Sequence, residues 1–400
     1  MKTFLFLLLL ISLIIVDYTF AQVPADQDTI YIQGGTFAGG ENSGLLEETI
    51  NGDTIASGAN RGERINPNRV YALNEGQVYY QLAPINVNNP NGILTIAGVP
   101  SKYRTTKPVI LIKPSNGKDV IINVGGVNLV YGNLKFDNIY YSTQQLDGYQ
   151  NNELFYCGTR NQLPQELIIN NCVFEFCNID LFDCTNESGA IGGWPKGAKF
   201  FITNSYFRNL FFPGQWWGSR IFQCKHPIDT LWVENCTITT GGLTFLQQNE
   251  LTDFAYFNHN TIINNKKYWL LSPYHKTFFV ANNIFINQNW VGEDTNIINN
   301  GTPFPSLTST INIDTNNTIN GLVVQQKYYV NGDSSLISDA LNFKNMQVYI
   351  SNNVNYYDSL LINNYYLSPV YINDTVGTIP SYLNYIGYGS GPWKIENIPC

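Results

Sequence analysis

Apolar residues recur along the middle of the chain in short strand-like units, each interrupted by a polar corner. Five units share this form, with apolar residues before the corner and a Phe or Ile shortly after it: 169–174, 202–207, 233–238, 257–262 and 280–285. A sixth unit, 313–319, fits with one extra residue, and a fainter match, 131–136, lies upstream. Short apolar runs bounded by turn residues indicate strands.

The corner position defines the repeat. It is occupied by Asn171, Asn204, Asn235, His259 and Asn282, at spacings of 33, 31, 24 and 23 residues. A period of this size is one coil of a solenoid, and such coils bury their apolar face only by stacking. Asn tolerates the left-handed conformation of a tight corner and can hydrogen-bond to its counterpart in the next coil. We therefore interpret His259 as a corner residue rather than a catalyst.

The composition favours parallel β coils over helical repeats, because Asn, Gly, Ile and Thr are poor helix formers. We expect one all-β domain, a parallel β-helix, over residues 22–386. A short amphipathic helix over residues 44–50, with Leu45, Leu46 and Ile50 on its apolar side, would cover the open first coil. The Gly-rich segment 387–400 is interpreted as a linker-like tail.

The N-terminal segment predicts export. Lys2, an apolar run and Thr19-Phe20-Ala21 before a polar segment are typical of a secretory signal peptide, here residues 1–21. The alternative is a membrane anchor, but Asp17 interrupts the run before the roughly 20 apolar residues that span a bilayer. We expect a secreted or cell-surface protein without a membrane span.

Charge narrows the choice of partner. The formal net charge is −8 and the pI about 4.9, which argues against a nucleic-acid partner because nucleic acids select basic surfaces. An anionic polysaccharide stays open, since a local basic cleft can form on an acidic protein. The seven cysteines lie in no zinc-ligand spacing with the three histidines, so we expect buried apolar thiols or an occasional bridge.

Several segments occur together in this chain: the 45–50 helix, segments 69–73, 76–80 and 94–98, and the Asn-Cys-Thr-Ile and Asn-Asn-Ile-Phe repeats. In this combination the chain resembles secreted bacterial right-handed β-helix proteins of the pectin-lyase-like superfamily over nearly its whole mature length. The resemblance implies a right-handed parallel β-helix. It does not fix an activity, because the superfamily includes pectate, alginate and chondroitin lyases, polygalacturonases and uncharacterised surface proteins.

The candidate functional residues lie where the spacing between successive corners is longest. We expect loop insertions at about 139–166, 184–199 and 210–228, because function concentrates in loops on a rigid scaffold. Their aromatic and basic side chains are candidate substrate-binding groups for sugar rings and acidic substituents, with packing of the loops as the alternative. This set comprises Tyr156, Arg160, Trp194, Trp216, Trp217 and His226.

Two functions remain open. The first is a monomeric, non-catalytic protein that binds an extracellular polysaccharide, either an acidic or a neutral glycan. The second is a polysaccharide lyase acting on a uronate polymer, with Arg208, Arg220 and Lys225 as candidate base or neutralising groups. Asp180, Asp183 and Glu187 are candidate ligands for calcium, the one cofactor we consider. Arg220 is also interpreted as a structural ion-pair partner. A hydrolase is disfavoured because the polygalacturonase signatures are missing.

Overall fold

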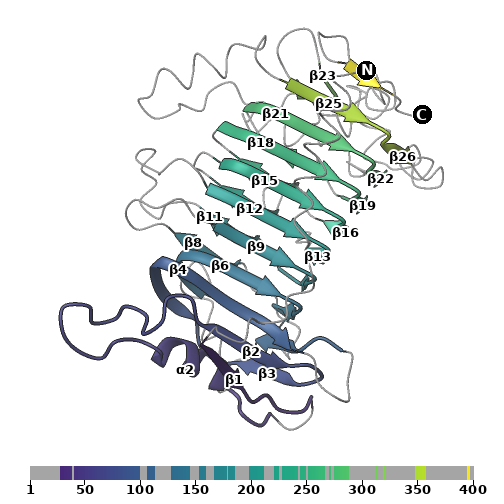
Figure 1. The fold of residues 1–400 in the computed structure, drawn as a ribbon. Helices are drawn as coiled ribbons and strands as arrows, with labels where there is room; N and C mark the ends of the chain where they lie inside the picture. Colours follow the sequence, from purple (N-terminus) through teal and green to yellow (C-terminus); the bar gives the residue numbers. More distant parts are fainter. Residues whose placement is uncertain are drawn as a thin grey trace, which may run out of the picture.

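A computed structural model describes residues 28–37, 40–99, 106–112, 128–144, 153–158, 166–177, 179–184, 198–210, 220–224, 228–241, 244–248, 251–265, 270–271, 274–287, 312–313, 319–320, 347–356 and 394–396. In this part of the chain, parallel strands stack as coils along one axis (Figure 1). The protein is an all-β parallel β-helix, as the repeat predicted. The predicted signal peptide lies outside the described residues.

Each complete central coil contributes one strand to each of three faces. Face A consists of β8 (Glu153–Gly158), β11 (Asp180–Cys184), β14 (Arg220–Cys224), β17 (Thr244–Gln248) and β20 (Leu270–Leu271). Face B consists of β9 (Glu166–Asn170), β12 (Ala198–Thr203), β15 (Ile228–Glu234), β18 (Leu251–Asn258), β21 (Tyr274–Ala281), β25 (Gln347–Ser351) and β27 (Lys394–Glu396). Face C consists of β3 (Val78–Gln81), β5 (Val109–Ile112), β7 (Tyr140–Ser142), β10 (Val173–Glu175), β13 (Tyr206–Leu210), β16 (Thr237–Gly241), β19 (Thr261–Ile263), β22 (Ile284–Ile286) and β26 (Val354–Tyr356).

Faces A and B begin at one branching strand. The first part of β6 (Asn128–Asp137) pairs with β8, and its second part pairs with β9. Before the branch, β4 (Asn86–Val99) pairs with β6 along both parts, and β2 (Val70–Asn74) and β1 (Thr29–Ile32) continue the sheet toward the N-terminus. A separate antiparallel pair joins β23 (Asn312–Ile313) to β24 (Ile319–Asn320).

The predicted corner column is confirmed. All five of its residues, from Asn171 to Asn282, have φ between 51° and 55°, in the left-handed region. Asn138 and Asn352 extend the column with φ 54°. The faint upstream match was wrong in register, because Asn133 lies inside β6 and the corner falls at Asn138. Side chains connect some coils directly: Asn235 Nδ2 donates to Asn204 Oδ1 over 2.8 Å.

A second, unpredicted polar column lies one residue after the corner and faces the interior. Asn260, Asn283 and Asn353 are almost fully buried. Asn283 Oδ1 accepts a hydrogen bond from the Asn260 backbone N–H over 2.8 Å, and Asn353 Oδ1 accepts one from the Asn283 backbone N–H over 2.9 Å. Each side chain thus satisfies a backbone group that the tight corner leaves unpaired, which matters because buried orphan groups are costly.

Aromatic rings fill the space between the faces. Phe155, Phe182 and Phe222 are register partners on face A, and their rings stack with centroids 5.6 and 5.1 Å apart. Phe174 and Phe207 form an equivalent pair on face C at 5.7 Å. Because the strands pair in register, a side chain of one size recurs at one height in neighbouring coils, and the core packs as columns.

The capping helix is confirmed as α2 (Leu45–Gly52), the one helix among the described residues. Leu46 and Ile50 are buried, and Gly44 at the N-cap has φ 87°, a conformation that glycine adopts without strain. Glu47 is also buried, and its Oε1 accepts the backbone N–H groups of Leu82 and Ala83. Within the described chain, no helix has the length and apolarity needed to cross a membrane.

Two stretches that we expected as insertions contain strands. Segment 139–166 includes β7 and β8, and segment 210–228 includes β14. Spacing between corners gives only the total length of a coil, so it does not separate a loop from a face A strand. The third stretch, 184–199, spans the connection from β11 to β12, most of which lies outside the described residues. Three residues of the predicted tail form β27, which pairs with β25.

The interior Asn column predicts a large stability effect. Asn283→Ala leaves the Asn260 backbone N–H and the Phe257 carbonyl without their partner, so we expect a loss of about 2–4 kcal/mol in the free energy of unfolding. The control Asn282→Gly keeps the left-handed corner and loses one hydrogen bond to Asn258 Oδ1, for which we expect about 1 kcal/mol or less. Urea denaturation measures both, and equal small losses would contradict the proposed role of the column.

Candidate functional site

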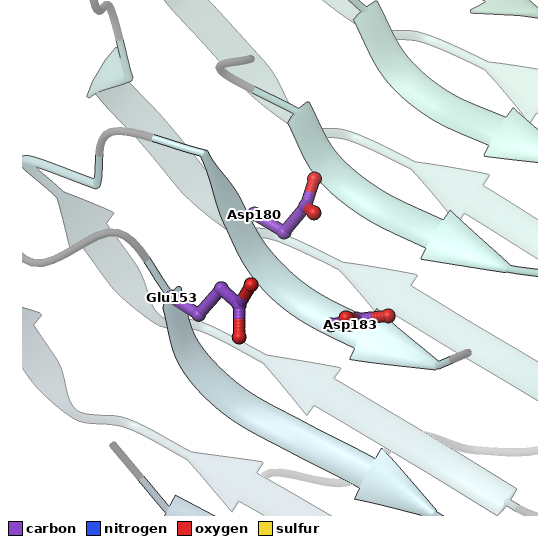
Figure 2. Close-up of side chains that lie close together, drawn as sticks. All are labelled: Glu153, Asp180 and Asp183. Atoms are coloured by element: carbon purple, nitrogen blue, oxygen red, sulfur yellow. The ribbon is translucent and has the colours of Figure 1, made fainter. Parts of the chain in front are cut away.

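The described chain brings three carboxylates together on face A. Glu153 begins β8, and Asp180 and Asp183 lie on β11, the next strand of the same face. One oxygen from each carboxylate lies within 4.8 Å of the other two. Figure 2 shows the Glu153 carboxylate directed toward the strand that carries both aspartates. We call these three residues, with Arg220, the face A cluster.

Arg220 closes the cluster from the following coil. It begins β14 as the register partner of Asp180, and its Nε and an Nη donate to the two Asp180 oxygens over 2.5 and 3.0 Å. Asp180 is 1 % exposed and Arg220 6 %, so this is a buried bidentate ion pair. The geometry bears out the interpretation of Arg220 as an ion-pair partner. A guanidinium held in this way is a poor candidate for a base.

The surroundings of Glu153 raise the pKa of its carboxyl group. Burial raises its pKa to about 8, the negative charges of Asp183 and Asp180 act in the same direction, and Arg220 opposes them. Its Oε2 is buried and has no hydrogen-bond partner among the described residues. At neutral pH this carboxyl group therefore holds a proton, unless a cation takes the place of that proton.

Arg208 belongs to a different face. It lies on β13 in face C, forms an ion pair with Glu175, and donates to Tyr140 Oη over 3.2 Å. Its guanidinium also lies over the rings of Tyr140 and Tyr206, 5.7 and 5.6 Å from their centroids. The structure therefore separates Arg208 from Arg220, with which the sequence grouped it, and gives it a full set of structural partners.

The other predicted residues divide into two groups. Asp180 and Asp183 lie together, as proposed for a metal site, and the backbone of Tyr156 pairs with Asp183. The remaining candidates lie outside the described residues: Arg160, Glu187, Trp194, Trp216, Trp217, Lys225 and His226. Sequence reasoning missed Glu153, because only the pairing of β8 with β11 places it beside the aspartates.

Aromatic residues of face B form a stacked column across coils. The rings of Trp232 and Tyr256 stack with centroids 4.0 Å apart, and those of Tyr256 and Phe279 at 5.0 Å. Their planes are within 28° and 15° of parallel, so the inner faces of the stack are occupied by neighbouring rings. Stacking on sugars needs an exposed ring face, whereas this arrangement stabilises coil stacking.

Comparison with known proteins adds no assignment: no protein-family model and no curated protein matches this chain. The fold and the cluster therefore define the protein as a parallel β-helix protein with a buried carboxylate and guanidinium cluster on one face.

The raised pKa of Glu153 predicts a pH dependence of stability. Between pH 4.5, the ordinary pKa, and about 8, the folded protein holds a proton on Glu153 that the unfolded chain releases. The free energy of unfolding should therefore fall as pH rises through this window in the presence of a chelator. In Glu153→Gln this decline should be largely removed, whereas Glu166→Gln, a partly buried acid on face B, should keep it. Urea denaturation at several pH values tests this, and identical slopes in wild type and Glu153→Gln would contradict it.

Proposed function

We propose that this protein is an exported, monomeric member of the pectin-lyase-like superfamily that binds an acidic extracellular polysaccharide at the face A cluster, with a divalent cation, calcium by preference, held by its carboxylates. The observation that carries the proposal is the convergence of three carboxylates on neighbouring coils, one of them with a buried oxygen that lacks a partner. The resemblance in the sequence is consistent with a glycan partner.

The balance of charges in the face A cluster supports a bound cation. Among the described residues, the three carboxylates face one guanidinium, and that guanidinium is bound to Asp180. Ionisation of Glu153 adds a negative charge close to Asp183 and Asp180, whose charges raise its pKa, while Arg220 acts in the opposite direction. Either a proton or a metal ion on Glu153 relieves this repulsion. The raised pKa of Glu153 means that, without a metal ion, the group binds a proton at neutral pH.

The donor set fits calcium. The three acidic side chains of the cluster offer carboxylate oxygens, which are the ligands that calcium and magnesium prefer. Calcium accepts irregular geometry and needs several further oxygens, which a bound glycan carboxylate and water would supply. Glu153 and Asp183 offer oxygens beside the ion pair, and Asp180 is oriented by Arg220. When bound, the cation would supply a positive charge for a uronate carboxylate.

A lyase is the second candidate, favoured by one observation: the pKa of Glu153 at about 8 lies near the operating range of a general base. In this alternative Asp180 and Asp183 hold the cation, and Glu153 accepts the proton beside the uronate carboxylate. A hydrolase is not favoured, because the polygalacturonase signatures are missing from the sequence.

Calcium titration by calorimetry in chelator-treated protein tests the cation site. We expect binding that weakens at least tenfold in Glu153→Gln and in Asp183→Asn, and that is unchanged in Glu166→Gln. Because the cation displaces the proton on Glu153, affinity should rise as pH increases from 6 to 9 and binding should release protons into the buffer. Unchanged binding in both cluster variants, with the fold verified by circular dichroism, would overturn the cation site.

A panel of pectate, alginate and chondroitin separates binding from cleavage. We expect pull-down of an acidic polymer with calcium and its loss with chelator or in Asp183→Asn. A rise in ultraviolet absorbance from unsaturated products would identify a lyase. That activity should then be lost in Glu153→Gln at a calcium concentration high enough to saturate the variant and sustain its polymer binding. Absence of both retention and product over the whole panel would reject the proposed function.

A further inference from the structure

Two cysteines on neighbouring coils lie directly opposite each other in the core. Cys184 is the last residue of β11 and Cys224 the last residue of β14, and the two are register partners in face A. Both are fully buried and belong to the main hydrophobic core. Their side chains therefore leave the sheet on the same side, toward the interior, at the same height along the strands.

Neighbouring strands lie about 4.7–4.9 Å apart, which falls within the roughly 4.4–6.8 Å between Cα atoms that a disulfide spans. Cys184 and Cys224 are both thiols in the structure. Cys157 follows Tyr156, the register partner of Asp183, so its backbone lies on the other side of Cys184 in the same column.

Among the cysteines whose side chains the structure describes, Cys184 and Cys224 are the one pair of register partners. Cys172 and Cys236 occupy one column with Ser205 between them, and the Cys177 thiol donates to the Asp180 carbonyl.

We propose that Cys184 and Cys224 form a disulfide that links two coils when the chain folds under oxidising conditions. The reaction is thiol–disulfide exchange: the Cys184 thiolate attacks the disulfide of a small-molecule or protein oxidant, and the Cys224 thiolate then displaces the mixed disulfide. The two cysteines lose two electrons and two protons, and the oxidant is reduced to two thiols. Since both sulfurs are fully buried in the finished fold, the bond forms while β11 and β14 are packing.

The link would act on the face A cluster. Asp180 and Arg220 begin the same two strands that Cys184 and Cys224 end. The bidentate ion pair and the disulfide thus tie the strand pair at both ends, and together they fix the register on which the distance between Asp180 and Arg220 depends. In the cell the proposal relies on the export that forms part of the proposed function.

The experiment uses the full chain refolded in a mixture of oxidised and reduced glutathione, so that it is independent of the export route. The protein is denatured with a thiol-alkylating reagent present and digested, and the peptides are analysed by mass spectrometry. We expect one linked peptide pair containing Cys184 and Cys224, two mass units below the dithiol form, with Cys172, Cys177 and Cys236 alkylated.

Two variants add a measurement of thermal stability. Reductant should lower the thermal denaturation midpoint of the wild type and of Cys236→Ala, and it should have no effect on Cys224→Ala. Alkylation of both Cys184 and Cys224, or a link from Cys184 to Cys157 instead, overturns the proposal. The peptide analysis of the unsubstituted chain decides even if a variant does not fold, and its outcome is independent of calcium or glycan binding.

Discussion

The in-register stacking of coils is the constraint on which the rest of this structure depends. No coil encloses a core of its own, and each tight corner leaves backbone groups that its own coil cannot pair. The next coil supplies the partner through the buried column of Asn260, Asn283 and Asn353, and Asn side chains of the corner column add direct links between coils. Register, corner conformation and core packing are therefore one property, since a shift of a single residue would break all three.

The same constraint explains why the cluster exists on face A. Parallel in-register pairing places residues at equivalent positions of successive strands beside each other. Side chains that are distant along the sequence therefore become neighbours across coils. Asp180 meets Arg220 because both begin their strands, and Glu153 meets Asp180 for the same reason. A buried ion pair contributes little net stability, because desolvation offsets most of the attraction. The remaining carboxylates raise the electrostatic cost further, and this makes the cluster a better candidate for binding than for stability.

The sequence predicted the features that repeat and missed those that depend on pairing. The corner residues were identifiable because a left-handed backbone selects Asn, and the capping helix because its apolar positions have helical spacing. Asn133 misled the upstream alignment, since an Asn inside a strand is indistinguishable from a corner residue until Asn138 is seen to have the positive φ. Of the candidate site, Asp180, Asp183 and Arg220 were found from composition. Glu153 required the register of β8 against β11, and Arg208 could be assigned to face C only from the fold.

The branch at β6 divides the described coils into two parts with different sheet arrangements. Toward the N-terminus, the single strand β4 pairs with both parts of β6. Beyond β6 the sheet divides into faces A and B, and the cluster lies on the first strands of face A. Coils after β14 contribute no described residue to the cluster, so whole coils could be gained or lost there during evolution, and only the length of the solenoid would change. A coil lost between β6 and β14 would remove the cluster itself. The architecture thus separates a part free to vary in length from a part that is not.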